Sequence, residues 1–290
     1  MKETFQILVD TACDVADEYG CAGGVSWIPM DCIVDDSEVV AFRGPDDRAA
    51  ITHIYEEQRL GKQVSTSQVT PAVYMDFFRK WASQGVDVLY IGLSSGLSAT
   101  VQSAEQAARM IREEIPQAQI GICDSLAATG GIGVLLERAV NDRAKGMSMA
   151  ETLEDLREAR HHLRHWFMVD DLNFLFRGGR LSRSSALIGT ALRIKPVLHV
   201  DENGKLAPLD KKRGRRQADR CMIEHYLAER SGEPGDRLYL CYTGDIEPAE
   251  HLAEQIKAEL PDAQCILRYM SPVIGAHTGP GACTIIHMGK

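Results

Sequence analysis

Short apolar runs alternate with stretches of helical periodicity through the first half of the chain. Each run is four to ten residues long and ends in a polar turn, which is typical of buried strands followed by crossover helices. The alternation therefore predicts a parallel sheet with helices packed on it. The predicted strands span 6–9, 25–34 (one or two strands), 86–93 and 119–123, and the predicted helices span 74–83, 101–115 and the stretch that ends near 145.

The second half of the chain mixes strands and helices in a less regular order. Asn203-Gly204 is a strong turn signal, and it predicts a hairpin between the apolar segments 194–200 and 205–210. A final strand leads back to a glycine-rich loop at 275–281. The other predicted strands span 166–169 and 238–242, and the predicted helices span 150–164, 184–192, 217–228 and 249–260. We expect two α/β domains, residues 1–160 with a mainly parallel sheet and residues 161–290 with a mixed sheet.

Composition and charge narrow the classes of partner. The chain is 44% hydrophobic and 25% charged, with a formal net charge of -9, so nucleic acid is a poor partner for its surface as a whole. The apolar run Ile7-Leu8-Val9 is cut at once by Asp10, which is too short for a secretory signal, and we expect a cytoplasmic protein. None of the eight cysteines forms a C-x-x-C pair, so neither a zinc ribbon nor a redox motif is indicated.

Three predicted strands end in polar turns. These turns are Asp10-Thr11, Ser94-Ser95 and Asp124-Ser125. In open parallel sheets, ligands bind outside the carboxyl ends of the strands, where helix N-termini point free N–H groups at an anion. The pattern favours a site for a small anionic group. The same residue types also cap helices, and both roles are compatible.

The run Gly275 to Gly281 holds His277 and Thr278 between glycines and a proline. Glycine allows unusual backbone angles and proline fixes one dihedral, so the run predicts a rigid loop that presents a ring nitrogen and a hydroxyl. A purely structural turn explains the composition equally well.

One motif suggests catalysis. Gly92-Leu93-Ser94-Ser95-Gly96 fits the nucleophile elbow G-x-S-x-G between a strand and a helix, and Asp245 and His277 follow in the order found in α/β hydrolases. However, no oxyanion loop of the H-G-G-G type is present. A serine esterase using Ser94, Asp245 and His277 is therefore the alternative function.

Two further clusters favour ordinary surface roles. His161, His162 and His165 lie at the end of the predicted helix 150–164, with His165 one residue beyond its last position. No acidic or cysteine ligand completes a metal set, so we expect no metal site. The basic segment 211–216 is interpreted first as a solvated loop and helix start. It also suits an acidic partner or a phosphate group. No nucleotide-binding loop is present, and we expect no cofactor.

Taken in order, the motifs resemble those of the DegV family, the fatty-acid-binding subunits of bacterial fatty acid kinase. The resemblance runs nearly end to end. It includes Asp10-Thr11-Ala12-Cys13-Asp14, Ser65-Thr66-Ser67-Gln68, Ser94-Ser95-Gly96-Leu97-Ser98-Ala99-Thr100, Asp124-Ser125, Asp171-Leu172, Gly178-Gly179-Arg180, Ile194-Lys195-Pro196, Arg213 and His277-Thr278-Gly279-Pro280-Gly281.

The resemblance implies a lipid carrier rather than an enzyme. A long-chain fatty acid would lie in a tunnel between the two domains, and a partner kinase would phosphorylate its carboxylate for phospholipid synthesis. Transient contact with a membrane surface is also implied. The carboxylate would meet Thr66, Ser94 or Ser95, and His277 with Thr278, whereas Arg180 and Arg213 would engage the kinase.

Two positions depart from the family pattern. Thr11 and Ala12 stand where the family usually has serine and threonine, so one hydroxyl is lost, and Ala99 replaces a usual glycine in the serine loop. Neither change touches Thr66, Ser95 or His277. We expect these differences to affect which lipid is preferred more than whether lipid is bound.

Overall fold

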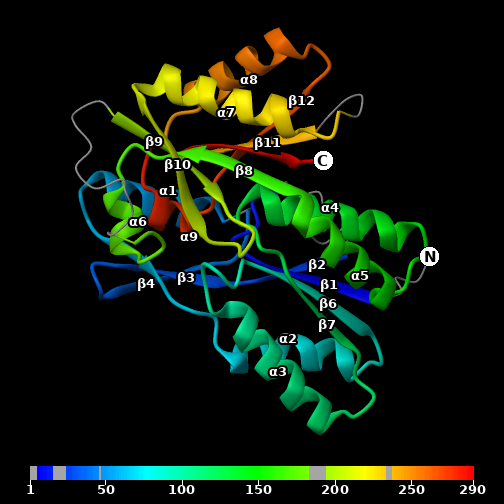
Figure 1. The fold of residues 1–290 in the computed structure, drawn as a ribbon. Helices are drawn as coiled ribbons and strands as arrows, with labels where there is room; N and C mark the ends of the chain where they lie inside the picture. Colours follow the sequence, from blue (N-terminus) through cyan, green and yellow to red (C-terminus); the bar gives the residue numbers. More distant parts are fainter. Residues whose placement is uncertain (1–4, 16–23, 46, 183–193, 233–236) are drawn as a thin grey trace.

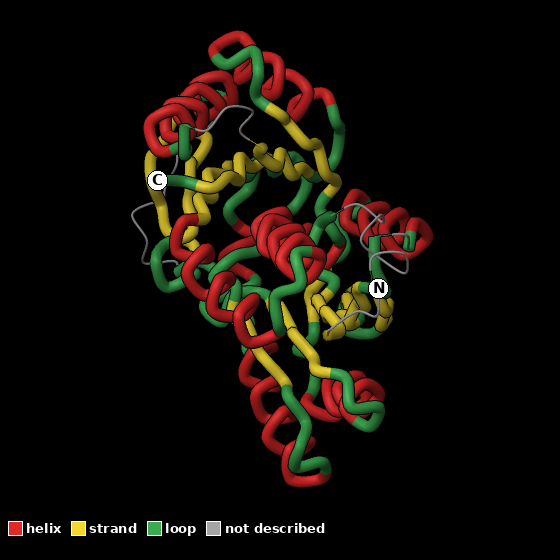
Figure 2. Tube along the Cα trace, turned by 90° about the vertical axis from the view of Figure 1, so that its right-hand side faces the viewer, coloured by secondary structure: helices red, strands yellow, loops and turns green. Residues whose placement is uncertain are grey.

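The computed structural model describes residues 5–15, 24–45, 47–182, 194–232 and 237–290. Within them, two main sheets are stacked with helices between them and on both outer sides (Figure 1). Figure 2, turned by 90°, shows the same succession of helical and strand layers. The mixed α/β fold with one parallel and one mixed sheet confirms the fold class expected from the sequence.

The first main sheet is wholly parallel. Its strands, in spatial order, are β2 (Val25–Ile28), β1 (Phe5–Asp10), β6 (Asp87–Gly92) and β7 (Ile120–Asp124). Every residue of β1 is buried, as expected for a central strand covered on both faces. The helices α2 (Pro71–Ala82) and α3 (Thr100–Glu114) cover one face, and α4 (Gly130–Ala144) and α5 (Met149–Ala159) cover the other (Figure 1).

The second main sheet is mixed, and only the β11–β12 pair is parallel. Its outer face carries α7 (Arg215–Glu229) and α8 (Glu247–Glu259) (Figure 1). Its strands, in spatial order, are β10 (Leu206–Arg213), β9 (Ile194–Val200), β8 (Leu163–Met168), β13 (Cys283–Met288), β11 (Arg237–Tyr242) and β12 (Gln264–Tyr269).

Helix α4 lies between the two main sheets and contacts strands of both. Its first turn is glycine-rich, and a Cβ atom added at Gly131 would lie 2.2 Å from Nε2 of His165 on β8. A Cβ atom at Gly130 would lie 2.8 Å from Sγ of Cys241 on β11. The glycines therefore let the mixed sheet approach the helix closely.

A small third sheet completes the fold beside these layers. It consists of β4 (Glu38–Phe42), β3 (Met30–Val34) and β5 (Val64–Thr66), all antiparallel, with α1 (Arg48–Arg59) next to it. The helix α9 (Pro272–Thr278) returns from the far end of the chain and packs on β5, α1 and β3. The short helices α6 (Asn173–Arg177) and η3 (Arg160–His162) are the remaining elements.

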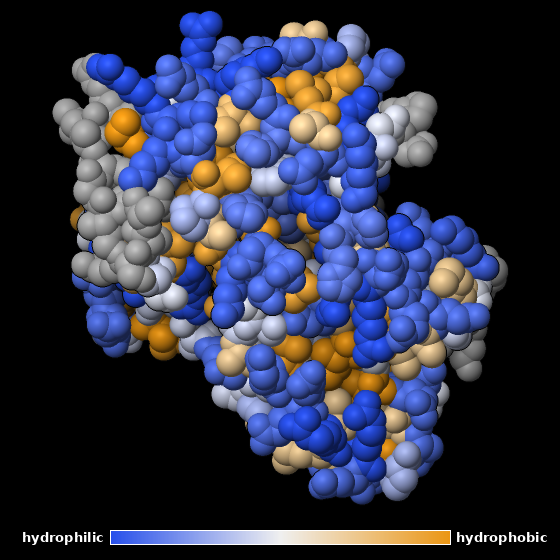
Figure 3. Space-filling view, viewed as in Figure 1, coloured by the Kyte–Doolittle hydropathy of each residue, from blue (hydrophilic) through white to orange (hydrophobic). Residues whose placement is uncertain are grey.

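The buried apolar residues form a large cluster around the parallel sheet and two smaller clusters on either face of the mixed sheet. The face seen in Figure 3 is largely hydrophilic, and its apolar areas lie in patches between polar ones. Large hydrophobic side chains that are exposed in the described residues are few, namely Val39, Leu60, Met110 and Ile246.

Several predicted elements differ from the observed ones. The predicted helix 150–164 is wrong at its end, because α5 ends at Ala159 and β8 begins at Leu163, where the chain pairs with β13. His161 is therefore in η3 and His165 is on a strand, so the two do not share a helix face. The predicted loop 275–281 is also wrong, because His277 and Thr278 form the last turn of α9.

Proline and glycine at the two ends of α9 explain why the loop prediction for 275–281 was wrong. Pro272 occupies the first turn of α9, where its missing N–H costs nothing, and Gly279 ends the helix with a φ of 69°. These residues are helix boundary signals rather than loop signals. The strands β4, β5 and β13 and the helix α1 were not predicted, and the predicted helix 184–192 lies outside the described residues.

Candidate functional site

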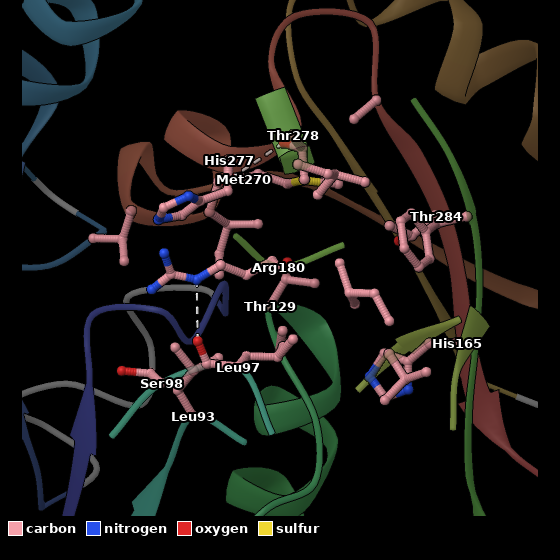
Figure 4. Close-up of a pocket in the computed structure, with 18 of the residues that line it drawn as sticks. Leu93, Leu97, Ser98, Thr129, His165, Arg180, Met270, His277, Thr278 and Thr284 are labelled. Carbon is pink, nitrogen blue, oxygen red and sulfur yellow. Dashed lines mark hydrogen bonds between the residues drawn. The ribbon is translucent and has the colours of Figure 1, made fainter. Parts of the chain in front are cut away.

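A cavity lies between the parallel and mixed sheets and is partly open to solvent. Its walls are mainly apolar, with contributions from the mixed sheet, the small third sheet, the loops that follow β6 and β7, and the helices α6 and α9. Figure 4 shows the side chains around it. The apolar lining includes Leu93, Leu97, Phe167, Leu175, Leu206 and Ile274.

One end of the cavity is polar. There, Oγ1 of Thr66 on β5 and Nε2 of His277 on α9 are 2.8 Å apart and share a hydrogen bond. The guanidinium of Arg180 lies beside His277 (Figure 4), where Nε donates to the Leu97 carbonyl at 3.1 Å and Nη1 donates to the Gly178 carbonyl. A hydroxyl, an imidazole and a cation thus meet at a single point of the cavity wall.

Helix α1 fixes the position of His277 by anchoring the helix that carries it. The hydroxyl of Tyr55 donates to the Met270 carbonyl at 3.0 Å, and Nε2 of Gln58 donates to the Gly275 carbonyl at 3.1 Å. On the opposite side, the His277 ring packs on Gly178, where an added Cβ atom would lie 2.3 Å from Nδ1. The ring is therefore held from both sides.

Burial makes His277 neutral at physiological pH. Desolvation, followed by the positive charge of Arg180, lowers the pKa of His277 from 6.5 to about 4. Desolvation also lowers the pKa of Arg180 from its ordinary value of 12.5. Among the described residues that line the cavity, Arg180 is then the one cation. The polar end can receive one anion through a cation and neutral hydrogen-bond donors, which an ionised group needs when it leaves water.

The residues that we predicted to form the site do not all line the cavity. Thr66, His277 and Thr278 do, although the Thr278 hydroxyl donates to the Ile274 carbonyl at 3.2 Å. Ser94 is fully buried, and its hydroxyl donates to the Gly204 carbonyl at 2.8 Å. The backbone N–H of Ser95 donates to Oδ1 of Asp124 at 3.0 Å.

Neither Ser94 nor Ser95 is among the described lining residues, whereas Ser98 is. Sequence reasoning did not single out Ser98. The only signal for it was its position one turn further along the same hydroxyl-rich loop.

The three polar turns follow strands of the parallel sheet, and their polar groups bind other parts of the protein. Asp10 accepts hydrogen bonds from the Tyr90 hydroxyl at 2.9 Å and the Leu93 N–H at 2.8 Å. Burial raises the pKa of Asp10 above its ordinary value. Thr11 accepts from the Met30 N–H at 3.0 Å, and the Ser125 hydroxyl donates to the Ala127 carbonyl at 3.2 Å. These groups tie neighbouring strands and loops together.

The two arginines that we expected to engage a kinase have different surroundings. Arg180 is half-buried and lines the cavity, whereas Arg213 is exposed at the end of β10. Around Arg213, the basic segment is partly neutralised, because Lys212 pairs with Asp210 at 2.6 Å and Arg215 pairs with Asp170 at 3.8 Å.

The three residues of the esterase alternative are not assembled into a catalytic triad. Ser94 bonds Gly204 and His277 bonds Thr66, as described above. Asp245 lines a separate surface pocket with Gly244 and Pro280. A nucleophilic serine needs a histidine within hydrogen-bond reach, and this geometry does not provide one.

Sequence reasoning missed the polar residues at the opposite end of the cavity. His165 and Thr284 line it there, on the side away from His277, and Thr129 lies between the two ends (Figure 4). Within the part of the chain that the structure describes, no cluster of histidine, cysteine or acidic residues is arranged to hold a metal ion. No helix in that part is both long and apolar enough to cross a bilayer.

Comparisons with proteins of similar sequence and fold place the chain in a family. Residues 4–290 match the family model described as uncharacterised protein of the DegV family. A DegV domain-containing protein of Lactococcus lactis, YteA, is 36% identical over 289 residues, which covers 99% of this chain and 98% of that protein.

Solved structures of similar proteins match this chain over nearly its full length. A fatty-acid-binding DegV family protein from Thermus thermophilus is 27% identical with a TM-score of 0.87, and the match covers 99% of this chain and 100% of that one. The Fak B3 protein of Streptococcus pneumoniae fatty acid kinase, loaded with linoleic acid, shares the fold at 21% identity with a TM-score of 0.85, covering 99% and 100%. The chain described here belongs to the DegV family.

Proposed function

We propose that this protein is a carrier that binds one long-chain fatty acid in the cavity between its two α/β domains, residues 1–160 and 161–290. The observation that carries the proposal is a mainly apolar cavity with a polar end at Thr66, His277 and Arg180. Fatty acid binding by the Thermus thermophilus relative supports the same class of ligand.

The two parts of such a ligand match the two parts of the cavity. Thr66 and the neutral His277 share a hydrogen bond, so the pair has one donor left for the carboxylate, which is neutralised by Arg180, with Ser98 within the same lining. Its methylene chain lies along the apolar wall, where each buried CH₂ contributes about 0.8 kcal/mol. Apolar burial supplies most of the affinity, and the polar end fixes the direction of the chain.

A carrier only presents its ligand, so the reaction of the carboxylate is assigned to a partner protein. A kinase transfers a phosphoryl group from its nucleotide to the bound carboxylate, and the resulting acyl phosphate serves phospholipid synthesis. Arg213, exposed on β10, is the proposed contact for that kinase. The half-buried Arg180 is better placed to meet the carboxylate or the phosphate formed on it. The proposal includes a cytoplasmic location and transient contact with a membrane surface during lipid exchange.

Mass spectrometry of the freshly purified protein under native conditions and after denaturation tests the proposal. We expect an adduct with the mass of a long-chain fatty acid that is lost on denaturation. Delipidated protein should take up added fatty acid, and it should do so more weakly when His277 is replaced by alanine. Absence of any adduct or uptake would overturn the carrier function.

A separate experiment addresses the esterase alternative. A fluorophosphonate probe should leave Ser94 unlabelled, because its hydroxyl is buried against the Gly204 carbonyl. Labelling of Ser94 that depends on His277 would favour the hydrolase over the carrier.

A further inference from the structure

The end of the cavity opposite His277 is closed by a thin partition. His165 on β8 and Val200 on β9 are the two described residues that line both the cavity and a separate groove behind it. The groove has polar walls that include His199, His225 and Glu229. The cavity and the groove are thus neighbours, and these two side chains separate them.

His165 is held rigidly in this partition. His165 is 5% exposed, and in the sheet it is paired with Ile286 on β13. Its Nε2 faces α4 so closely that a Cβ atom on Gly131 would lie 2.2 Å away. The imidazole cannot move towards α4 without displacing the helix.

The same end of the cavity is unsuited to a second charged group. Burial lowers the pKa of His165 to about 3, so its ring is neutral at physiological pH. Between the two ends, the Thr129 hydroxyl donates to Asp14, and at this end the Thr284 hydroxyl accepts from the Cys241 N–H at 3.1 Å. The described lining here offers no cation, so the geometry fits an apolar chain end rather than a second carboxylate.

We propose that His165, together with Val200, is the end wall of the acyl-chain tunnel and sets the longest chain that the protein accepts. This inference rests on the proposed fatty acid binding and goes beyond it, because it assigns the length limit to one partition. Removing the His165 ring joins the tunnel to the groove behind it. Longer chains then pass their methyl end through the opening.

Competition among fatty acids of different length tests the partition. Delipidated wild-type protein and the variants His165→Ala and Val200→Ala are incubated with an equimolar series of saturated fatty acids from myristic to lignoceric acid. The bound species are then quantified by native mass spectrometry. We expect His165→Ala to favour chains longer than the wild-type limit, with a gain of about tenfold for each two further methylenes accommodated. Val200→Ala should give a smaller shift in the same direction.

Two control variants separate the end wall from general loosening of the site. His165→Phe keeps a ring of similar size and should retain the wild-type length limit. His199→Ala enlarges the groove alone, because His199 lines the groove and not the cavity, and it should leave that limit unchanged. Circular dichroism and thermal unfolding establish that each variant folds.

The possible outcomes distinguish this inference from the proposed function. Variants at 165 and 200 that fold and bind, yet keep the wild-type length profile, would overturn the end-wall assignment. An equal gain of long chains in His199→Ala would do the same. If the wild-type protein binds no fatty acid of any length, the proposed function fails and this inference fails with it.

Discussion

Two histidines lie at opposite ends of the cavity, and their surroundings suit them to different roles. His277 is on a helix, shares a hydrogen bond with Thr66 and lies beside a cation. His165 is on a strand, is sealed against α4 and has an Nε2 atom without a hydrogen-bond partner in the described residues. Burial lowers the pKa of both, to about 4 for His277 and about 3 for His165.

The difference shows that neutrality alone does not define a ligand-binding histidine. Both rings are uncharged at physiological pH, but only His277 meets a hydroxyl and a guanidinium at the cavity wall. His165 offers bulk at the point where the cavity ends. We therefore expect the first to determine whether a carboxylate is held, and the second to determine only how much chain fits.

The largest test of this contrast removes each imidazole in turn. His277→Ala should weaken fatty acid binding about 10- to 100-fold, because the variant loses one hydrogen bond to a charged group and leaves Thr66 without its partner. His165→Phe should leave the affinity for chains within the length limit unchanged within about threefold, since no polar contact is lost. Titration of delipidated protein with a fluorescent fatty acid measures both. Equal losses in the two variants would contradict the contrast.

A second test moves His277 without altering it. A methyl group at Gly178 would collide with Nδ1 of His277, whereas one at Gly179 meets nothing within 4 Å. Gly178→Ala should therefore weaken binding about tenfold by displacing the ring from Thr66. Gly179→Ala is the matched control, because it introduces only the strain of a residue with a φ of 71°. The assignment is wrong if Gly179→Ala weakens binding as much as Gly178→Ala.

The pH dependence of stability provides a third test, centred on His165. Its pKa falls from 6.5 in the unfolded chain to about 3 in the fold, mainly through desolvation. The stability contributed by the neutral ring is full above pH 6.5 and is lost as the pH falls towards 3. The loss is about 1.4 kcal/mol per pH unit.

His165→Phe should remove this slope. The difference in unfolding free energy between about pH 7 and about pH 5 should shrink by about 2 kcal/mol relative to the wild type. Urea denaturation at both pH values measures the change. An unchanged slope would show that His165 is not sealed from solvent.

The contribution of Asp14 to stability has the opposite pH dependence, so Asp14 serves as a reference for His165. Burial raises its pKa from 3.8 to about 7, so its contribution to stability is fully present below pH 3.8 and is lost as the pH rises through 7. Asp14→Asn should therefore steepen the loss of stability on acidification, whereas His165→Phe flattens it.

The smallest expected effect is at Arg213, which lies at neither end of the cavity. Arg213→Ala should change fatty acid affinity by less than about twofold, because the side chain is exposed and is absent from the described lining. In a reconstituted assay with the partner kinase, the same variant should slow phosphorylation of the bound fatty acid. A loss of fatty acid binding itself would place Arg213 at the site and remove it as a docking residue.

The parallel sheet could be predicted from sequence because its strands are continuous apolar runs that end in polar turns. The strands β4 and β5 of the small sheet and the strand β13 were missed for the opposite reason. The β4 segment is mostly exposed, and β13 follows a glycine-rich boundary that was interpreted as a loop. Pairing with strands distant in sequence, rather than local composition, stabilises these segments.

The site was only partly predictable. Thr66 and His277 followed from the resemblance to the family, and the structure brings them together although 211 positions separate them. Sequence alone did not show that Ser94 turns towards Gly204, because the hairpin tip that accepts its hydrogen bond is 110 positions away. His165 was assigned to a helix, and its place in the cavity wall depends on strand register with β13.

The return of α9 to the first third of the chain also affects the order in which a newly made chain can acquire its ligand. The hydrogen-bond acceptors of Tyr55 and Gln58 are the carbonyls of residues 270 and 275, which are 215 and 217 positions further along the chain. A nascent chain that stops before residue 277 has no imidazole opposite Thr66 and no α9 wall. On the proposed function, a fatty acid is therefore held only by a chain that has been synthesised past residue 277. Bound fatty acid then distinguishes such chains from shorter nascent ones.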